Sequence, residues 1–176
     1  MVSLKFFVSD LKAASRSSNF LINAKWFLLN HSIHIVFFYR LGQSAARVPI
    51  FGKLLRFVVE YAIRVLYASD ISCLSKIGEG LIIVHGHDIV IGADVVIGRN
   101  CKIFNGVTLG NKDIEQSSKG NQPTLGDHVV LSTGAKLLGP IEIGSYVTIG
   151  ANSVVLNDCP SRSVVVGVPA RVVKKI

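Results

Sequence analysis

The chain has 176 residues, a length that fits one domain with an appendage and excludes two full domains. Hydrophobic residues make up 49% and charged residues only 17%, which excludes a disordered chain. The net charge of +8 is concentrated in residues 1–69, where nine Lys/Arg stand against two Asp/Glu. These cations alternate with Phe, Leu and Val instead of clustering, so they favour an anionic lipid or other anionic partner over nucleic acid.

Three stretches of the basic region are predicted to be helical: Ser3–Ala14, Phe20–Tyr39 and Leu54–Tyr67. In the last, Arg56, Glu60 and Arg64 follow at four-residue steps and share one side of the helix. The second is long and apolar but interrupted by polar residues, so we interpret it as a buried or interfacial helix and not as a membrane span. We expect residues 1–69 to form an α-helical region capable of peripheral membrane contact, in a cytoplasmic protein.

From Ile71 onward an aliphatic residue returns every six positions. Six residues provide one short strand and one turn, with the aliphatic side chain pointing inward. Each unit buries its apolar face only by stacking on the next, so residues 70–176 are predicted to form a mainly β solenoid of about four to five coils. The thirteen members of the series are Ile71, Ile77, Ile83, Ile91, Ile97, Ile103, Leu109, Leu125, Leu131, Leu137, Ile143, Ile149 and Val155.

The repeat is interrupted by a two-residue slip after Ile83 and by the polar segment NKDIEQSSKGNQPT at 111–124. This segment must leave the solenoid as a loop. We expect it to reach over a neighbouring subunit's site, the alternative being a tolerated surface insertion. Residues 161–176 are expected to form a C-terminal tail. The three cysteines are widely spaced and form no CxxC, which indicates neither a disulfide framework nor a zinc ribbon.

Several motifs within about residues 60–174 resemble the hexapeptide-repeat acyltransferases. They are the His85-Gly86 pair before the slip, GVTLG at 106–110, IGANSVV at 149–155 and GVPAR at 167–171. Together they resemble the serine acetyltransferase branch and its short polysaccharide O-acetyltransferase relatives. The resemblance implies a left-handed parallel β-helix, acetyl-CoA as donor substrate, and a homotrimer with its sites between subunits.

His85 is the candidate general base. O-acetylation needs a base that removes the hydroxyl proton as the oxygen attacks a thioester carbonyl, and imidazole titrates in the right range. The family's catalytic histidine matches this position, whereas the alternative is a histidine merely solvated on a coil face. The resemblance also implies that Asp70, fifteen residues earlier, orients His85. A turn residue at the junction of helix and solenoid is the alternative for Asp70.

Further site residues follow from the resemblance. Those expected to bind acetyl-CoA are Gly110, Asn111, Thr133, Gly134, Ala151, Arg171 and Lys174. The glycines let backbone N–H groups approach the donor, although turn geometry also accounts for them, and the two cations could pair with phosphates. Those expected near the acceptor are His87, Asp88, Asn105 and Gln122. His85-x-His87 also resembles a metal pair, but the histidines that metal-binding members use are missing, so no metal is expected.

Two departures from the serine acetyltransferases bear on the acceptor. Val84 stands where that family has an Asp, and Asn121-Gln122-Pro123 replaces an Arg-His-Pro segment that helps to hold the amino acid. With a helical region about half the family's length, these changes favour a sugar hydroxyl of a surface polysaccharide or its lipid-linked precursor as acceptor. The alternatives are serine O-acetylation in cysteine biosynthesis, favoured by the terminal Ile176, and a non-catalytic scaffold that docks on a membrane.

Overall fold

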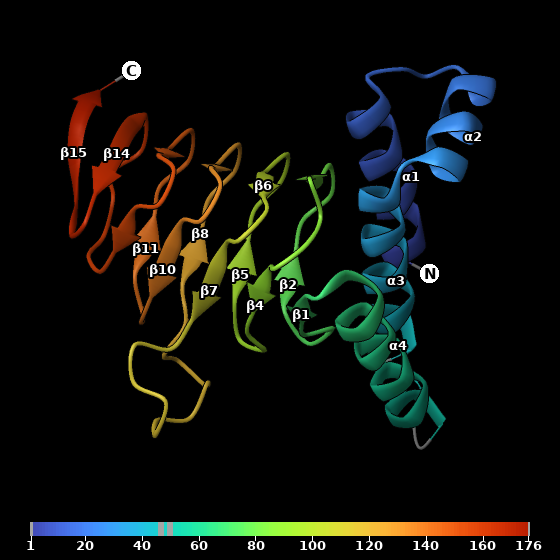
Figure 1. Cartoon of the computed structure of the whole chain (residues 1–176), viewed down its shortest axis with the longest axis horizontal. Helices are drawn as coiled ribbons and strands as arrows, with labels where there is room; N and C mark the ends of the chain where they lie inside the picture. The colour runs from blue at the N-terminus through green and yellow to red at the C-terminus, as the bar shows by residue number, and fades with distance from the viewer. Residues whose placement is uncertain (1, 46–47, 49–50, 176) are drawn as a thin grey trace.

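The computed structural model describes residues 2–45, 48 and 51–175, so Ile176 lies outside the described residues. The helices stand together at one end of a solenoid (Figure 1). They are α1 Val2–Ser15, α2 Phe20–Leu29, α3 His31–Ala45 and α4 Phe51–Tyr67. The strands that follow are β1 Asp70–Ile71, β2 Lys76–Ile77, β3 Ile82–Val84, β4 Val90–Ile91, β5 Val96–Ile97, β6 Lys102–Phe104, β7 Thr108–Gly110, β8 Thr124–Leu125, β9 Val130–Leu131, β10 Lys136–Leu138, β11 Glu142–Ile143, β12 Thr148–Ile149, β13 Val154–Val155, β14 Ser163–Gly167 and β15 Ala170–Lys175.

Successive hexads occupy the three sides of each coil. The β1 sheet has the order β1-β4-β7-β10-β13, the β2 sheet β2-β5-β8-β11, and the β3 sheet β3-β6-β9-β12-β14-β15. Neighbouring coils pair in parallel, which stacks like positions: Ile71 on Ile91, Ile91 on Leu109, and Leu109 on Leu137. All thirteen aliphatic residues of the series are buried. The parallel β-solenoid predicted from the six-residue period is confirmed.

The interruptions fall where the sequence predicts. Residues 111–123 leave the coils between β7 and β8 and form the loop drawn in yellow in Figure 1. Residues 161–175 differ from the tail that was expected. Within them β14 and β15 pair as an antiparallel hairpin, which closes the end of the solenoid opposite the helices.

The predicted helix Phe20–Tyr39 is wrong as a single element, because the chain breaks at Asn30. The backbone of Asn30 is extended, with φ −108° and ψ 106°, and its N–H donates to the carbonyl of Trp26 to end α2. Its side-chain oxygen accepts the N–H of Ser32 at 3.0 Å and so caps the start of α3. The other two predicted helices lie within α1 and α4.

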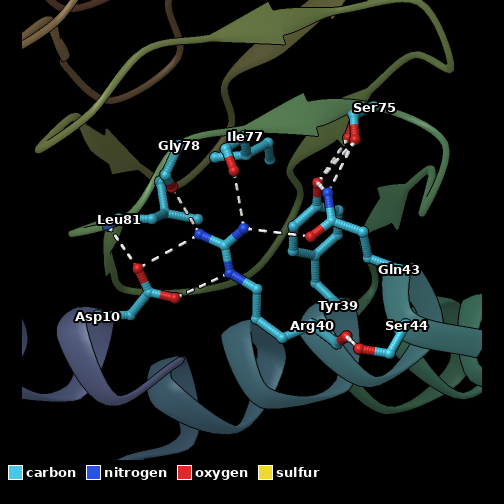
Figure 2. A network of polar contacts seen from close by, with 9 residues as sticks. All are labelled: Asp10, Tyr39, Arg40, Gln43, Ser44, Ser75, Ile77, Gly78 and Leu81. Carbon is cyan, nitrogen blue, oxygen red and sulfur yellow. Dashed lines mark hydrogen bonds and ion pairs between the residues drawn. The ribbon is translucent and has the colours of Figure 1, made fainter. Parts of the chain in front are cut away.

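A buried ion pair joins the helices to the first coil (Figure 2). Asp10 of α1 and Arg40 of α3 are both 0% exposed, and Arg40 Nε donates to Asp10 Oδ2 at 2.9 Å. The guanidinium also donates to the carbonyls of Ile77 and Gly78, at 2.7 and 2.6 Å, while Asp10 Oδ1 accepts the N–H of Leu81 at 2.8 Å. The pair therefore provides hydrogen-bond partners for backbone groups at the end of the solenoid that faces the helices.

Helix α4 turns its charged stripe toward the solenoid. Arg56 and Glu60 form an ion pair at 3.7 Å, and Glu60 Oε1 accepts the N–H of Cys73 at 2.8 Å. The opposite stripe is apolar and exposed, comprising Phe51, Leu54, Val58, Tyr61 and Val65. Of the helices described here, none is long and apolar enough to cross a membrane. That finding leaves the peripheral membrane contact of residues 1–69 a prediction.

Candidate active site

Many of the candidate residues lie along one corner of the solenoid, where each coil turns from the β3 sheet into the β1 sheet. We call it the β3/β1 corner; from the first coil to the fourth it consists of His85–Asp88, Asn105-Gly106, Thr133-Gly134 and Ala151-Asn152. Backbone hydrogen bonds connect successive levels, from Gly106 N–H to His87 O at 3.2 Å and from Gly134 N–H to Asn105 O at 2.9 Å. The fold thus aligns residues that are far apart in the sequence.

The two-residue slip enlarges this corner in the first coil only. Ile71 and Ile91 are stacked although twenty positions apart, whereas Ile91 and Leu109 are eighteen apart. This corner has left-handed backbone at both His85, φ 53°, and Asp88, φ 54°, whereas the next corners have it at one residue each, as at Gly106 and Gly134. The imidazoles of His85 and His87 and the carboxylate of Asp88 are consequently exposed. The slip therefore projects a histidine out of an otherwise regular coil.

Helix α3 holds the corner in place through Gly86. A side chain at Gly86 would begin 2.4 Å from Ile35 Cδ1, so the glycine lets α3 pack closely against the corner without displacing Ile35. The Gly86 N–H donates to Ser32 Oγ at 3.0 Å. The backbone on which His85 stands is therefore fixed by α3, through one hydrogen bond and one close contact.

Asp70 lies on β1 and pairs with Val90 of β4, the strand that follows the corner of His85. Its Oδ1 accepts from Arg64 Nη2 at 2.7 Å, and this carboxylate raises the pKa of the exposed Arg64 guanidinium. Among the described residues no hydrogen bond joins Asp70 to His85. The orienting role of Asp70 stays a prediction, and within one chain its carboxylate is engaged by α4.

His85 opens into a cleft of about 550 Å³ between the helices and the first two coils. The outward residues of β3 and β6 form its floor, and the ends of α1, α2 and α3 form its walls. Besides His85, its basic lining residues are Arg16, His31 and Lys102, and no Asp or Glu lines it. A reacting group placed against His85 would thus lie in positively charged surroundings.

Three lining residues are not among those predicted from the sequence: Arg16, His31 and Lys102. A signal existed for Lys102: it occupies an outward position next to buried Ile103, and its strand pairs with β3, which runs directly into His85. Arg16 carried no such signal, because only the packing of α1 against β3 brings it there.

A second group of candidates lies at the corner between the β1 sheet and the β2 sheet, where β7 ends. Gly110 and Asn111 begin the loop there, and Gln122 ends it. Gln122 Nε2 donates to Asn111 Oδ1 at 2.9 Å, and Gln122 Oε1 accepts the N–H of Asp94 at 2.8 Å. Within one chain the structure does not bring this group together with His85.

Arg171 and Lys174 are exposed on β15, at the far end from the helices. The cysteine thiols, in contrast, are all buried, which raises the pKa of Cys73 to about 12 and that of Cys101 to about 11. Since the thiolate is the reactive form, neither thiol is suited to attack a substrate. In the described part of the chain, no three His, Cys, Asp or Glu side chains are grouped to hold a metal ion.

Comparison with known proteins places this architecture in a family. Residues 122–157 match the bacterial transferase hexapeptide family, described as six repeats. The soybean serine acetyltransferase apoenzyme superimposes on 97% of the chain with a TM-score of 0.86 and 32% identity, and the chain covers 69% of it. The chain belongs to the hexapeptide-repeat acyltransferase family. A crystal structure of serine acetyltransferase from Neisseria gonorrhoeae is similar as well, with a TM-score of 0.88 and 31% identity.

Curated members of the family are similar in sequence over the solenoid. A serine acetyltransferase of Synechococcus elongatus is 44% identical over 127 residues, which is 72% of this chain and 50% of that protein. One from Staphylococcus aureus is 50% identical over 101 residues, which is 57% of this chain and 46% of that protein. The chain spans about half the length of these curated relatives.

The comparisons contradict the predicted glycan acceptor, because the relatives and neighbours are serine acetyltransferases. That prediction took the shorter helical region as the mark of another branch. The helices nevertheless superimpose together with the coils, since the neighbours match 97–99% of the chain. The serine acetyltransferases thus share the helical region that this chain has, and Val84 and Asn121 do not change the fold.

Proposed function

We propose that this protein transfers the acetyl group of acetyl-CoA to the hydroxyl of serine, with His85 as general base. The observation that carries the proposal is the exposed imidazole at the enlarged β3/β1 corner, opening into a cleft of substrate size. The names of the relatives support serine as acceptor, and a neighbour described as a serine acetyltransferase in complex with CoA, 32% identical with a TM-score of 0.83, supports the donor.

In the proposed reaction, neutral His85 accepts the hydroxyl proton of the acceptor as its oxygen attacks the thioester carbonyl. The carbon–sulfur bond then breaks, and the departing CoA thiolate takes the proton from the imidazolium, which restores the neutral base. The acetyl ester and free CoA are the products. Gly86, fixed by Ser32, keeps the base in position, so little reorganisation is needed at the moment of proton transfer.

The donor is proposed to lie along the β3/β1 corner. Thr133, Gly134 and Ala151 follow His85 at successive levels of this corner, toward the hairpin where Arg171 and Lys174 are exposed. An extended molecule with a thioester at one end and phosphates at the other fits such an arrangement. The two cations would pair with the phosphates.

A homotrimer is part of the proposal. His85 lies at the corner before the strands of the β1 sheet, whereas Gly110, Asn111 and Gln122 lie at the corner after them. They can therefore reach such a site only from a neighbouring copy. The exposed apolar stripe of α4 supports contact between copies as well. Light scattering of the purified chain should give three times the monomer mass; a monomer that turns over at full rate would contradict it.

The test of the activity is release of free thiol from acetyl-CoA in the presence of L-serine. His85→Asn should lower the rate by about 10²–10⁴-fold, the usual contribution of a general base. Asparagine suits the left-handed backbone at this position better than alanine does. The matched control is His128→Asn, at another exposed left-handed corner, which should leave the rate unchanged. Lack of thiol release with serine would contradict the proposal.

A further inference from the structure

We infer that the cleft beside His85 binds the carboxylate of the acceptor through Arg16 and Lys102 and has no counterpart for its ammonium group. The acceptor class is therefore a short hydroxycarboxylate, of which serine is one member. This inference rests on the proposed function, because it assigns the contacts of the same acceptor. The loop before β8 ends in Asn121-Gln122-Pro123 and contains no arginine.

Asn121 and Gln122, at the end of the loop, are not suited to hold a carboxylate. Gln122 uses its amide oxygen for the N–H of Asp94 and its amide nitrogen for Asn111, at 2.8 and 2.9 Å. Asn121 Nδ2 donates to the carbonyl of Ser117 at 2.9 Å, within the loop itself. Neither residue is cationic, so neither can form the charge-assisted, paired hydrogen bonds by which arginine holds a carboxylate.

The cleft offers cations from another part of the chain. Lys102 stands beside Ile82 on the floor, and Arg16 follows the end of α1 on the wall. No ion pair occupies either residue among the described side chains, although Arg40, Arg56, Arg64 and Arg99 are all paired. Two unpaired cations in the cleft that holds the proposed base are suited to an anionic group on the molecule from which His85 removes the proton.

Within one chain, the ammonium of serine finds no carboxylate in the same cleft. The lining that one chain provides contains no Asp or Glu, and apolar Val84 stands immediately before His85. Asp88 is the acid next in sequence to His85, but it is not part of the lining and turns toward Gly106 of the second coil. Arg16 and Lys102 both line the space, and their positive charges disfavour a positively charged substituent there.

The test compares three acceptors of similar size in the thiol-release assay. The first is L-serine; β-hydroxypropionate keeps its carboxylate and lacks the ammonium, whereas serinol, the matching aminodiol, keeps the ammonium and lacks the carboxylate. We expect β-hydroxypropionate to have a KM equal to or below that of L-serine. Serinol should have a KM at least about tenfold higher than L-serine, as for loss of a hydrogen bond to a charged group.

Variants assign the contact to its residues. Lys102→Gln and Arg16→Gln should each raise the KM for β-hydroxypropionate by about tenfold and leave the KM for acetyl-CoA unchanged, while Lys102→Arg should retain most of the affinity. The control is Lys76→Gln, which removes an exposed lysine from β2 in another sheet and should change neither constant.

Calorimetric titration of β-hydroxypropionate separates this inference from the proposed function. Turnover of serine but neither turnover nor binding of β-hydroxypropionate would overturn the inference and leave the function intact. Binding that is lost in Lys102→Gln, without turnover of any acceptor, would support the inference and contradict the function. A KM for serine more than tenfold below that for β-hydroxypropionate would also overturn the inference, because it would require a partner for the ammonium.

Discussion

The coils and the helices bury their residues by different means. In the coils, every inward position of the series is Ile, Leu or Val, and neighbouring coils stack like on like. The helices bury aliphatic and aromatic residues as well, but they meet the first coil through a charged pair whose hydrogen bonds end on backbone atoms. Repetition makes the solenoid uniform, whereas the junction depends on a few residues that occur once.

The largest effect that this comparison predicts is at the junction. Asp10→Asn removes the negative charge beside buried Arg40 and should lower the free energy of unfolding by about 3–5 kcal/mol, the cost of leaving a buried charge uncompensated. Urea denaturation followed by circular dichroism measures it. Lys12→Gln, an exposed lysine of the same helix, is the control and should change stability by less than about 0.5 kcal/mol. Equal losses of unfolding free energy in the two variants would mean that the Asp10–Arg40 pair does not stabilise the contact between the helices and the first coil.

The next effect belongs to the coils. Leu109→Ala and Leu137→Ala each empty a fully buried inward position of the β1 sheet, and each should cost about 3 kcal/mol by lost burial and a cavity. Because the two leucines occupy equivalent positions in neighbouring coils, their losses should agree within about 1 kcal/mol. The same denaturation experiment compares them, with the outward Val130→Ala as a control of smaller effect. A large difference between the two losses of unfolding free energy would contradict the uniformity expected of the solenoid.

A smaller effect is expected at the break between α2 and α3. Asn30→Ala removes the side-chain acceptor for the Ser32 N–H and should cost about 1 kcal/mol, the usual value of a helix cap. Asn30→Asp, which keeps an acceptor, should restore most of the loss. Unchanged stability in the alanine variant would show that packing alone holds the start of α3.

The smallest effect concerns a surface pair on the coils. Arg99 and Asp127 lie 3.5 Å apart and are largely exposed. Arg99→Gln should therefore change the unfolding free energy by less than about 0.5 kcal/mol. Thermal melting at low and high salt would reveal any contribution of this ion pair to stability. A loss of unfolding free energy above about 1 kcal/mol would contradict the expectation that the buried junction pair stabilises the fold far more than this surface pair does.

The sequence by itself determined the solenoid, its loop and the corner at which a histidine projects. The six-residue period is local: each hexad needs only its neighbours to fix which side chain points inward, so the pattern of Ile, Leu and Val can be followed directly along the chain. The two-residue slip beside His85 interrupts that same pattern, so its position could be located in the sequence.

Only the tertiary structure decided how the helices complete the site. The break at Asn30, the pair of Asp10 with Arg40, and the meeting of Arg16 with Lys102 arise from packing between segments that have no common period. Such contacts depend on the directions in which whole elements cross, and one-dimensional spacing does not encode those directions. The exposed histidine could therefore be predicted from the sequence, whereas the cations that line the cleft beside it could not.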